Sequence, residues 1–242
     1  MDAAQAQMFT EAVERDGARL LEVAEVDLMA SVPACPDWDV ARLVVHVGQV
    51  HGYIAGVLEN PSLDPPTHRF ERPDTDDIIS WAGDARARLV AALGVTDPAT
   101  PTWSWGEDHT AAFFHRRMAA ETLVHRIDVE DAVDRPSPID GDLATDAVDE
   151  FIDVGLRFST NPDKAFAYPE GSLHLHRTDG PGEWLLRNEG GTLVATREHA
   201  KGDAAVRGSG GDLLRFMWNR PGAEVEILGD AEVATAWRSL SA

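Results

Sequence analysis

The stretch AAETLVHRIDVEDA, residues 119–132, places charged groups where a helix should present its apolar face. Glu121, His125 and Asp128 are spaced four and three residues apart, so in a helix all three point along one side. Apolar residues flank this stripe at both ends. A buried carboxylate or imidazole without a partner is unfavourable, so the pattern predicts that these side chains meet polar partners inside the fold.

The chain around this stretch has the period of long helices as far as about residue 134. Asp39 is the expected N-cap of one of them, and Gly94 is the expected C-cap of another. Four helices of this length predict an all-α four-helix bundle over residues 1–136. The connections at 59–73 and 94–108 are long, which suggests a role for them at one end of the bundle. The expected helices span residues 3–30, 39–58, 74–93 and 109–134.

The second half of the chain, residues 137–242, has a different pattern of apolar residues. A helical stretch at 142–158 is followed by segments with a period of two, which is typical of strands. SLHLHRT, EWLLRNE and GTLVATRE are separated by DGPG and GG, and they predict an antiparallel meander. AAVRGS and EVEILG predict two more strands, and GDLLRFMWNR and DAEVATAWRSL predict two helices. The second half is therefore expected to be a smaller α+β domain.

Composition narrows the classes of partner. The chain has 42 acidic and 21 basic residues and a formal net charge of -21, which disfavours binding to nucleic acid or to an anionic membrane surface. No apolar run is long enough to span a membrane, and the N-terminus does not resemble a secretory signal. The single cysteine, Cys35, excludes an internal disulfide. We expect a cytoplasmic protein that is a monomer.

A third polar residue joins the inward stripe from another helix. His46 follows Leu43 by three residues and precedes Val50 by four, so it shares their buried face. Two interpretations stay open for His46, Glu121 and His125. They either pair by hydrogen bonds inside the bundle, or they bind a divalent metal. Two histidines and a glutamate suit zinc with a fourth position open to water or to a thiolate, which is the catalytic arrangement.

Other polar residues allow two interpretations each. Asp128 either orients a metal ligand or is an ordinary exposed neighbour. Cys35 is a candidate fourth ligand, although a packed or idle thiol is favoured. His115 lies on a different helix face from Glu121 and is a weaker candidate for the mouth of the pocket, and His51 is expected on the surface.

His174 and His176 alternate with apolar residues in a predicted strand, so they share one face. An ordinary polar sheet face is favoured over a metal site formed by the two histidines. The glycine-rich segment GSGGD at 208–212 lacks a following Lys-Ser or Lys-Thr pair, and it is therefore interpreted as a turn into a helix rather than a phosphate-binding loop.

Three segments resemble one known family. VPACPDWDVARLVVHVGQVHGYI at 32–54 contains the pattern P-x-W-x-x-x-x-L-x-x-H, in which Trp38 is expected to anchor the start of a helix. ETLVHRIDVEDA at 121–132 contains E-x-x-x-H-R-x-D. GSGGDLLRFMWNRP and VEILGDAEVATAW, within 208–237, are similar to the C-terminal part of the same family. Together they resemble the mycothiol-dependent maleylpyruvate isomerases over nearly the whole chain.

The resemblance implies a fold and a set of site residues. It implies a DinB-like metal-binding four-helix bundle followed by a C-terminal domain like that of sterol carrier proteins. It also implies that His46, Glu121 and His125 bind Zn²⁺, and that Arg220 matches the catalytic arginine of the family. From helix position alone, Arg220 would instead be a C-terminal helix cap.

The resemblance further implies a zinc-dependent enzyme that uses mycothiol. The activated thiol would add to the double bond of maleylpyruvate, and rotation and elimination would then give the trans isomer. A mycothiol S-transferase acting on other electrophiles and a non-catalytic metal- or ligand-binding protein both remain alternatives. Substrate choice is expected to lie in a cleft between the domains, where TWSWGED at 102–108 offers aromatic walls and Arg220 reaches a carboxylate.

Overall fold

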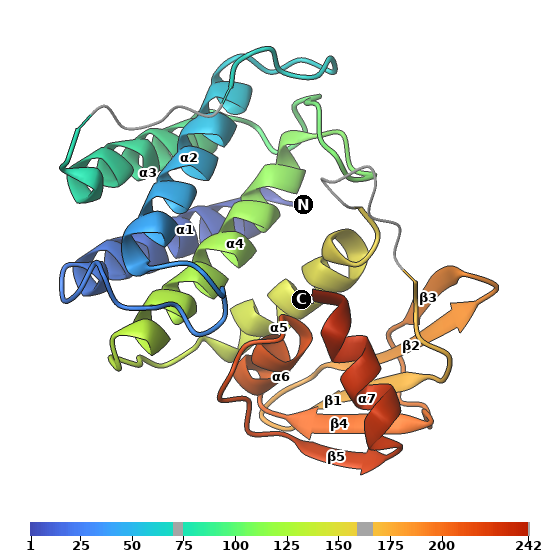
Figure 1. Ribbon diagram of the computed structural model, residues 1–242. Helices are drawn as coiled ribbons and strands as arrows, with labels where there is room; N and C mark the ends of the chain where they lie inside the picture. The colour runs from blue at the N-terminus through green and yellow to red at the C-terminus, as the bar shows by residue number, and fades with distance from the viewer. Residues whose placement is uncertain (70–74, 159–166, 242) are drawn as a thin grey trace. The chain divides into compact units, whose positions relative to one another are not determined.

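The protein is described here by a computed structural model that covers residues 1–69, 75–158 and 167–241 (Figure 1). The chain divides into two compact units, Met1–Ser137 and Pro138–Ala242. The boundary expected from the sequence, between residues 136 and 137, is one residue away from this division. Each unit has its own set of buried apolar side chains.

The first unit is helical, as predicted. Three of its long helices begin at an aspartate whose side chain accepts a hydrogen bond from a free backbone N–H group. The carboxylate of Asp39 accepts from the Arg42 N–H, which confirms the expected N-cap. Asp77 caps the third helix in the same way, and the predicted start of that helix near residue 74 lies outside the described residues. The long helices of the described part are α1 Ala3–Ala24, α2 Val40–Glu59, α3 Ile78–Val95 and α4 Ala111–Ala132.

Two predicted helix ends are wrong. The first helix ends at Ala24 rather than near residue 30, because the backbone carbonyls of Leu28 and Ala30 accept hydrogen bonds from N–H groups at the start of α2. Together with the turn closed by the Ala30 N–H on the Asp27 carbonyl, these bonds hold the segment as a series of turns instead of further helix. Gly94 lies inside α3 rather than capping it, since Thr96 is the residue that closes the last turn through hydrogen bonds to a helical carbonyl.

Helix α4 is the central element of the first unit. It packs against α1 and α2, and α1 and α2 each also pack against α3 (Figure 1). Nearly every residue from Ala111 to Glu130 is buried, including the charged side chains. Arg126 lies 3.6 Å from Asp16 of α1 and 3.8 Å from Glu130, so charged groups on α4 find partners inside the unit. A helix buried on all sides explains why its sequence lacks a single apolar stripe.

The second unit is α+β, as predicted. The three predicted meander strands pair antiparallel, and the turn between β2 and β3 uses Gly190 and Gly191, both with positive φ. The sheet order is β3-β2-β1-β4-β5, and β4 pairs parallel with β1. The strands are β1 Leu173–Arg177, β2 Glu183–Glu189, β3 Thr192–Thr196, β4 Ala204–Gly208 and β5 Glu226–Gly229.

Helices α6 and α7 cover one face of this sheet (Figure 1). The alternation of side chains along β1 sends Leu173 and Leu175 to the covered face and His174 and His176 to the other. Trp184 of β2 pairs with Leu175 and shares its face. The helices of this unit are α5 Gly141–Glu150, which continues as a π-helical turn Phe151–Gly155, then α6 Gly210–Met217 and α7 Ala231–Arg238.

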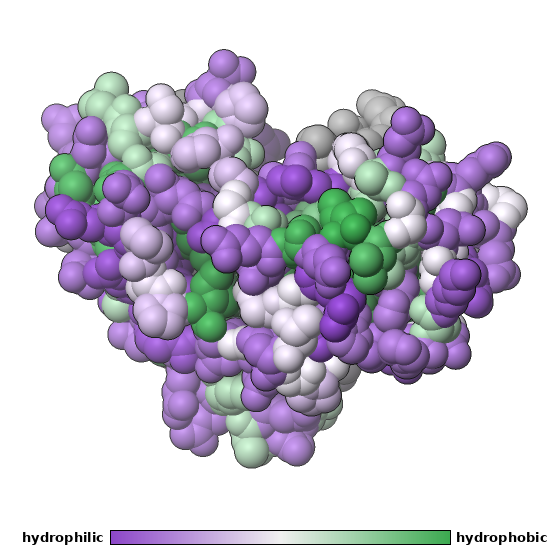
Figure 2. Space-filling model, turned by 90° about the horizontal axis from the view of Figure 1, so that it is seen from below, coloured by the Kyte–Doolittle hydropathy of each residue, from purple (hydrophilic) through white to green (hydrophobic). Residues whose placement is uncertain are grey.

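In the part of the chain that the structure describes, the exposed large apolar side chains are spread along the sequence from Met1 to Leu228. Figure 2 shows one face of the molecule that is mostly hydrophilic, with hydrophobic residues in a few separate groups. Among the described residues, no helix has the length and apolar character needed to cross a lipid bilayer.

Candidate metal centre

Side chains from α2 and α4 converge on one carboxylate oxygen. The Nε2 atom of His46 lies 3.3 Å from Oε1 of Glu121, and the Nε2 atom of His125 lies 3.1 Å from the same oxygen. The two imidazole rings lie edge to face, with their centroids 5.1 Å apart. The structure therefore brings together the three residues that the sequence singled out from two separate helices.

The spacing of these atoms fits a zinc ion. Bonds of about 2.0–2.1 Å in a tetrahedral arrangement place neighbouring ligand atoms about 3.3 Å apart. Ligand atoms of His46, Glu121 and His125 all lie within 4.8 Å of one another. Two imidazole nitrogens and one carboxylate oxygen also form a donor set that zinc prefers.

The group is accessible from one side. The side chain of His46 is 33% exposed, whereas those of Glu121 and His125 are buried. Solvent therefore reaches the group at His46, the partly exposed member, and not at the buried Glu121 or His125.

Asp128 holds the ring of His125. Its Oδ2 atom lies 2.9 Å from Nδ1 of His125, and the side chain of Asp128 is completely buried. If Nδ1–H donates to this carboxylate, the lone pair of His125 is on Nε2 and faces Glu121. Burial alone would lower the pKa of His125, but Glu121 and Asp128 raise it to about 9. Of the two interpretations of Asp128, the exposed neighbour is therefore wrong.

Arg117 is a site residue that the sequence analysis missed. Its guanidinium forms an ion pair with Oε2 of Glu121 one helical turn away, so the two oxygens of Glu121 have different partners. Burial would raise the pKa of Glu121, but Arg117 and His125 hold it well below its usual range. The four-residue spacing of Arg117 and Glu121 was the signal that would have identified this pair.

Trp38 lies against the exposed member of the group. Its ring contacts His46 edge to face at 5.3 Å, and the guanidinium of Arg42 lies 4.7 Å from the centre of the indole. Trp38 thus positions the His46 ring in addition to packing at the start of α2.

The other polar candidates of the first unit lie elsewhere. Cys35 packs against the apolar core near the start of α2 and is not part of the group of ligand atoms. His115 is buried, and its Nδ1 atom lies 3.3 Å from Thr10 of α1. The expectation that His51 is exposed is wrong: it is 1% exposed, and its Nε2 atom lies 3.0 Å from Oγ1 of Thr122. Because α2 packs on both α3 and α4, its buried face is wider than one stripe.

Arg220 and the 102–108 loop, the other parts that the sequence analysis assigned to the site, contact residues of their own unit. Arg220 of the second unit is only 8% exposed, donates a hydrogen bond to the Trp218 carbonyl and places its guanidinium 5.5 Å from the Trp218 ring. In the 102–108 loop, Trp105 packs edge to face on Phe113 and Phe114 of α4.

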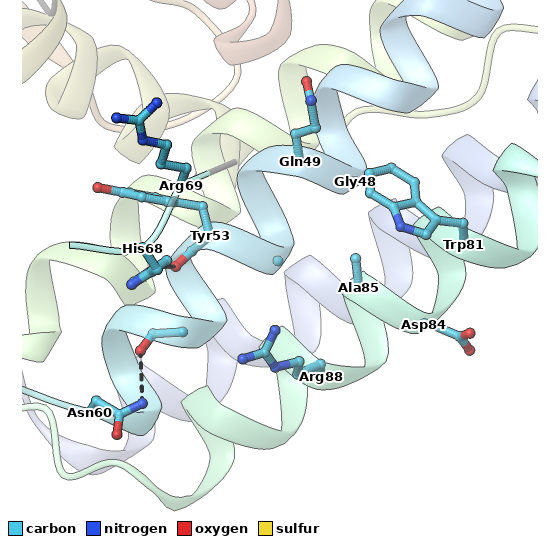
Figure 3. A pocket seen from close by; sticks show the side chains of 12 residues that line it. Gly48, Gln49, Tyr53, Asn60, His68, Arg69, Trp81, Asp84, Ala85 and Arg88 are labelled. Carbon is cyan, nitrogen blue, oxygen red and sulfur yellow. Dashed lines mark hydrogen bonds between the residues drawn. The ribbon is translucent and has the colours of Figure 1, made fainter. Parts of the chain in front are cut away.

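A cavity of about 340 Å³ opens on another side of α2 (Figure 3). It lies between α2 and α3, and none of the residues of the candidate metal centre line it. Gly48 and Trp81 lie in close contact at one end of it: a Cβ atom on Gly48 would lie 2.3 Å from the Trp81 ring. Tyr53, His68 and Arg69 border the cavity together in Figure 3.

Comparison with known proteins identifies a matching family and two solved structures of similar fold. The model of the mycothiol maleylpyruvate isomerase N-terminal domain matches residues 10–130. A crystal structure of the mycothiol-dependent maleylpyruvate isomerase is similar with a TM-score of 0.57 and 15% identity, covering 92% of each chain. A mutant of that enzyme with one histidine replaced by alanine gives 0.60 and 13%, again over 92% of each chain. These solved structures share the fold of this chain, and no curated protein matches the sequence.

Proposed function

This chain belongs to the mycothiol maleylpyruvate isomerase family, and from that membership we propose that it is a zinc-dependent enzyme that uses mycothiol. The proposed reaction is of the maleylpyruvate cis-trans isomerase type. The thiol sulfur adds to the activated double bond, rotation occurs about the resulting single bond, and loss of the same thiol restores the double bond. The thiol is regenerated, and no oxidant or reductant is needed.

One observation carries the proposal. His46 and His125, from different helices, both direct Nε2 at Oε1 of Glu121, at separations that match the edges of a tetrahedral zinc site. An ordinary buried ion pair needs one imidazole for one carboxylate. Two imidazoles on one oxygen, with a second carboxylate behind one of them, support a metal site more than a structural pair.

The residues of the chain have separate roles in this proposal. His46, Glu121 and His125 hold the ion, Asp128 fixes the orientation of His125, and Arg117 occupies the second oxygen of Glu121. When bound, zinc supplies a Lewis acid with an open position that lowers the pKa of a thiol. The partial exposure of His46 supports approach of a thiol from the solvent side.

We propose that Arg220 binds substrate or cofactor, because residues 208–237 resemble the C-terminal part of the family. A guanidinium binds a carboxylate through two parallel hydrogen bonds, and both maleylpyruvate and mycothiol-sized ligands offer polar groups for such contacts. The guanidinium of Arg220 lies 5.5 Å from the centre of the Trp218 ring and donates to the Trp218 carbonyl at the end of α6. These contacts hold the head group in place, and they also fit a helix cap.

Two alternatives differ in chemistry. A mycothiol S-transferase would use the same metal and thiol but would retain the new carbon–sulfur bond to another electrophile. A non-catalytic metal protein would favour a closed site with four protein ligands. Among the described residues, the group has three members and excludes Cys35, which supports the catalytic arrangement.

A screen of thiols against substrates tests the function. Zinc-loaded protein would be assayed with mycothiol, glutathione or no thiol, on maleylpyruvate and on a panel of other electrophiles. Isomerisation of maleylpyruvate that requires mycothiol supports the proposal. Conjugate formation without isomerisation supports the transferase, and no turnover with any pair would contradict an enzyme of this type.

A further inference from the structure

A second group of imidazoles lies in the C-terminal unit, on the sheet face that α6 and α7 leave uncovered. His174 and His176 occupy alternate positions of β1, and the antiparallel register places Glu183 of β2 directly opposite His176. Residues opposite each other on neighbouring strands share a face, so these three side chains meet. His199, which follows β3, reaches the same carboxylate.

All three imidazoles contact Glu183. The Nε2 atom of His174 lies 2.6 Å from Oε2, while the Nδ1 atoms of His176 and His199 lie 2.5 and 3.0 Å from Oε1. The rings lie close to one another: the centroid of His174 is 5.3 Å from that of His199, and that of His176 is 5.9 Å from His199. Ligand atoms of His174, Glu183 and His199 all fall within 4.8 Å of one another.

The environment of the group suits a cation. His174 is 5% exposed, but the side chain of His199 is 77% exposed, so an ion can enter from solvent without unfolding the sheet. Burial would raise the pKa of Glu183, yet the three imidazoles hold it below its usual range and keep it anionic. Arg207 of β4 lies opposite His176 and is paired with Glu226 at 3.1 Å.

Hydrogen bonds to Glu183 alone are a poor explanation for three imidazoles around one carboxylate. A neutral imidazole has one N–H group. All three rings would therefore have to donate their single hydrogen bond to the same carboxylate. Protonated rings at these separations would repel one another. A cation among the nitrogens and the oxygen removes both difficulties, because each ring then offers a lone pair and carries its proton on the other nitrogen, where it faces away.

We propose that His174, Glu183 and His199 form a second site for a divalent transition metal, with His176 beside it on Oε1 of Glu183. Two nitrogens and one oxygen favour zinc, copper or nickel over magnesium or calcium, which prefer oxygen ligands. The site shares no residue with His46, Glu121 and His125. It would tie the segment after β3 to strands β1 and β2, and its exposed ligand makes its metal exchangeable.

The test uses the full chain with the first site disabled. The His46→Ala protein, stripped of metal, would be titrated with Zn²⁺ alone by calorimetry. We expect uptake of about one equivalent, with affinity weakened at least about tenfold when His199→Ala is added. His109 is exposed and outside both groups, so adding His109→Ala is the matched control and should leave the titration unchanged.

The exposure of His199 means that its replacement should leave the fold intact, which circular dichroism would verify. Failure of the His46→Ala protein to take up zinc would overturn the proposal. Uptake that His199→Ala leaves unaltered would overturn it as well, because the bound ion would then lie elsewhere.

Discussion

The Nδ1 atom of His125 lies 2.9 Å from Oδ2 of Asp128, and both side chains are buried on α4. A carboxylate in this position fixes the tautomer and orientation of an imidazole whose other nitrogen faces Glu121. The pair explains why α4 keeps a second buried carboxylate beside the proposed metal ligands. It also defines a prediction that does not depend on knowing the substrate.

Replacing Asp128 by Asn should weaken zinc binding at the first site by about ten- to a hundredfold. The amide keeps the shape of the side chain but loses the charge that stabilises the Nδ1–H tautomer. Competition with a chromophoric chelator measures the affinity. The control is Asp134→Asn, at an exposed position just beyond α4, which should bind zinc like the unmodified protein. Equal affinities in both variants would remove Asp128 from the site.

Replacing Gly48 by Ala should destabilise the first unit by about 1–3 kcal/mol, because the added Cβ would overlap the Trp81 ring at 2.3 Å. Gly52, one turn further along α2, is the matched control. A Cβ there meets only Ala85 at 3.9 Å, so Gly52→Ala should be neutral or stabilising by up to about 1 kcal/mol. Urea unfolding measures both changes. A similar loss in the two variants would mean that the contact of α2 with Trp81 is not the cause.

His51 should make the stability of the protein fall in mildly acidic solution. Burial lowers the pKa of His51 to about 3 from its ordinary value of 6.5, so the unfolded chain binds one more proton between these two pH values. The stability contributed by the neutral ring is therefore complete above pH 6.5 and is lost as the pH falls towards 3.

Comparison with His51→Gln isolates this effect, since the amide does not titrate. The advantage of the unmodified protein in free energy of unfolding should shrink by about 2 kcal/mol between pH 7 and pH 5. The measurements need a chelator, so that metal loss does not contribute. A difference that stays constant with pH would show that His51 is not buried in the neutral form.

Replacing Arg220 by Lys should leave zinc content and folding unchanged but reduce kcat/KM at least about tenfold, or roughly 1.4 kcal/mol of transition-state binding. Lysine retains the charge but cannot form two parallel hydrogen bonds to a carboxylate. Steady-state kinetics on the substrate found in the thiol screen measures the effect. Full activity in Arg220→Lys would leave the arginine with a structural role only.

Helical periodicity was sufficient to predict that His46, Glu121 and His125 face the interior, where the structure brings them together. The spacing of Glu121, His125 and Asp128 fixes their common side, and the apolar neighbours of His46 fix its direction. Periodicity could not show that α4 is covered on every side, which is why Asp128 had two interpretations. The burial of His51 was missed for the same reason: it depends on a second helix packing against α2, which no local pattern records.

In the second unit, local sequence predicted the strands but not all of their pairing. The strand segments and their meander followed from alternation and turn residues, but the parallel pairing of β4 with β1 did not. His174 and His176 were recognised as sharing a face. Their meeting with Glu183 and His199 depends on strand register and on the path after β3, which are set by tertiary packing rather than by local sequence.

The most direct test of the central claim is the metal content of protein purified without added metal. The His199→Ala background weakens the proposed second site, and inductively coupled plasma mass spectrometry would compare this protein with the same protein carrying His46→Ala. The account predicts about one zinc per chain in the first protein and less than about a tenth in the second. Equal zinc in the two proteins, or none in either, would contradict a metal site built from His46, Glu121 and His125.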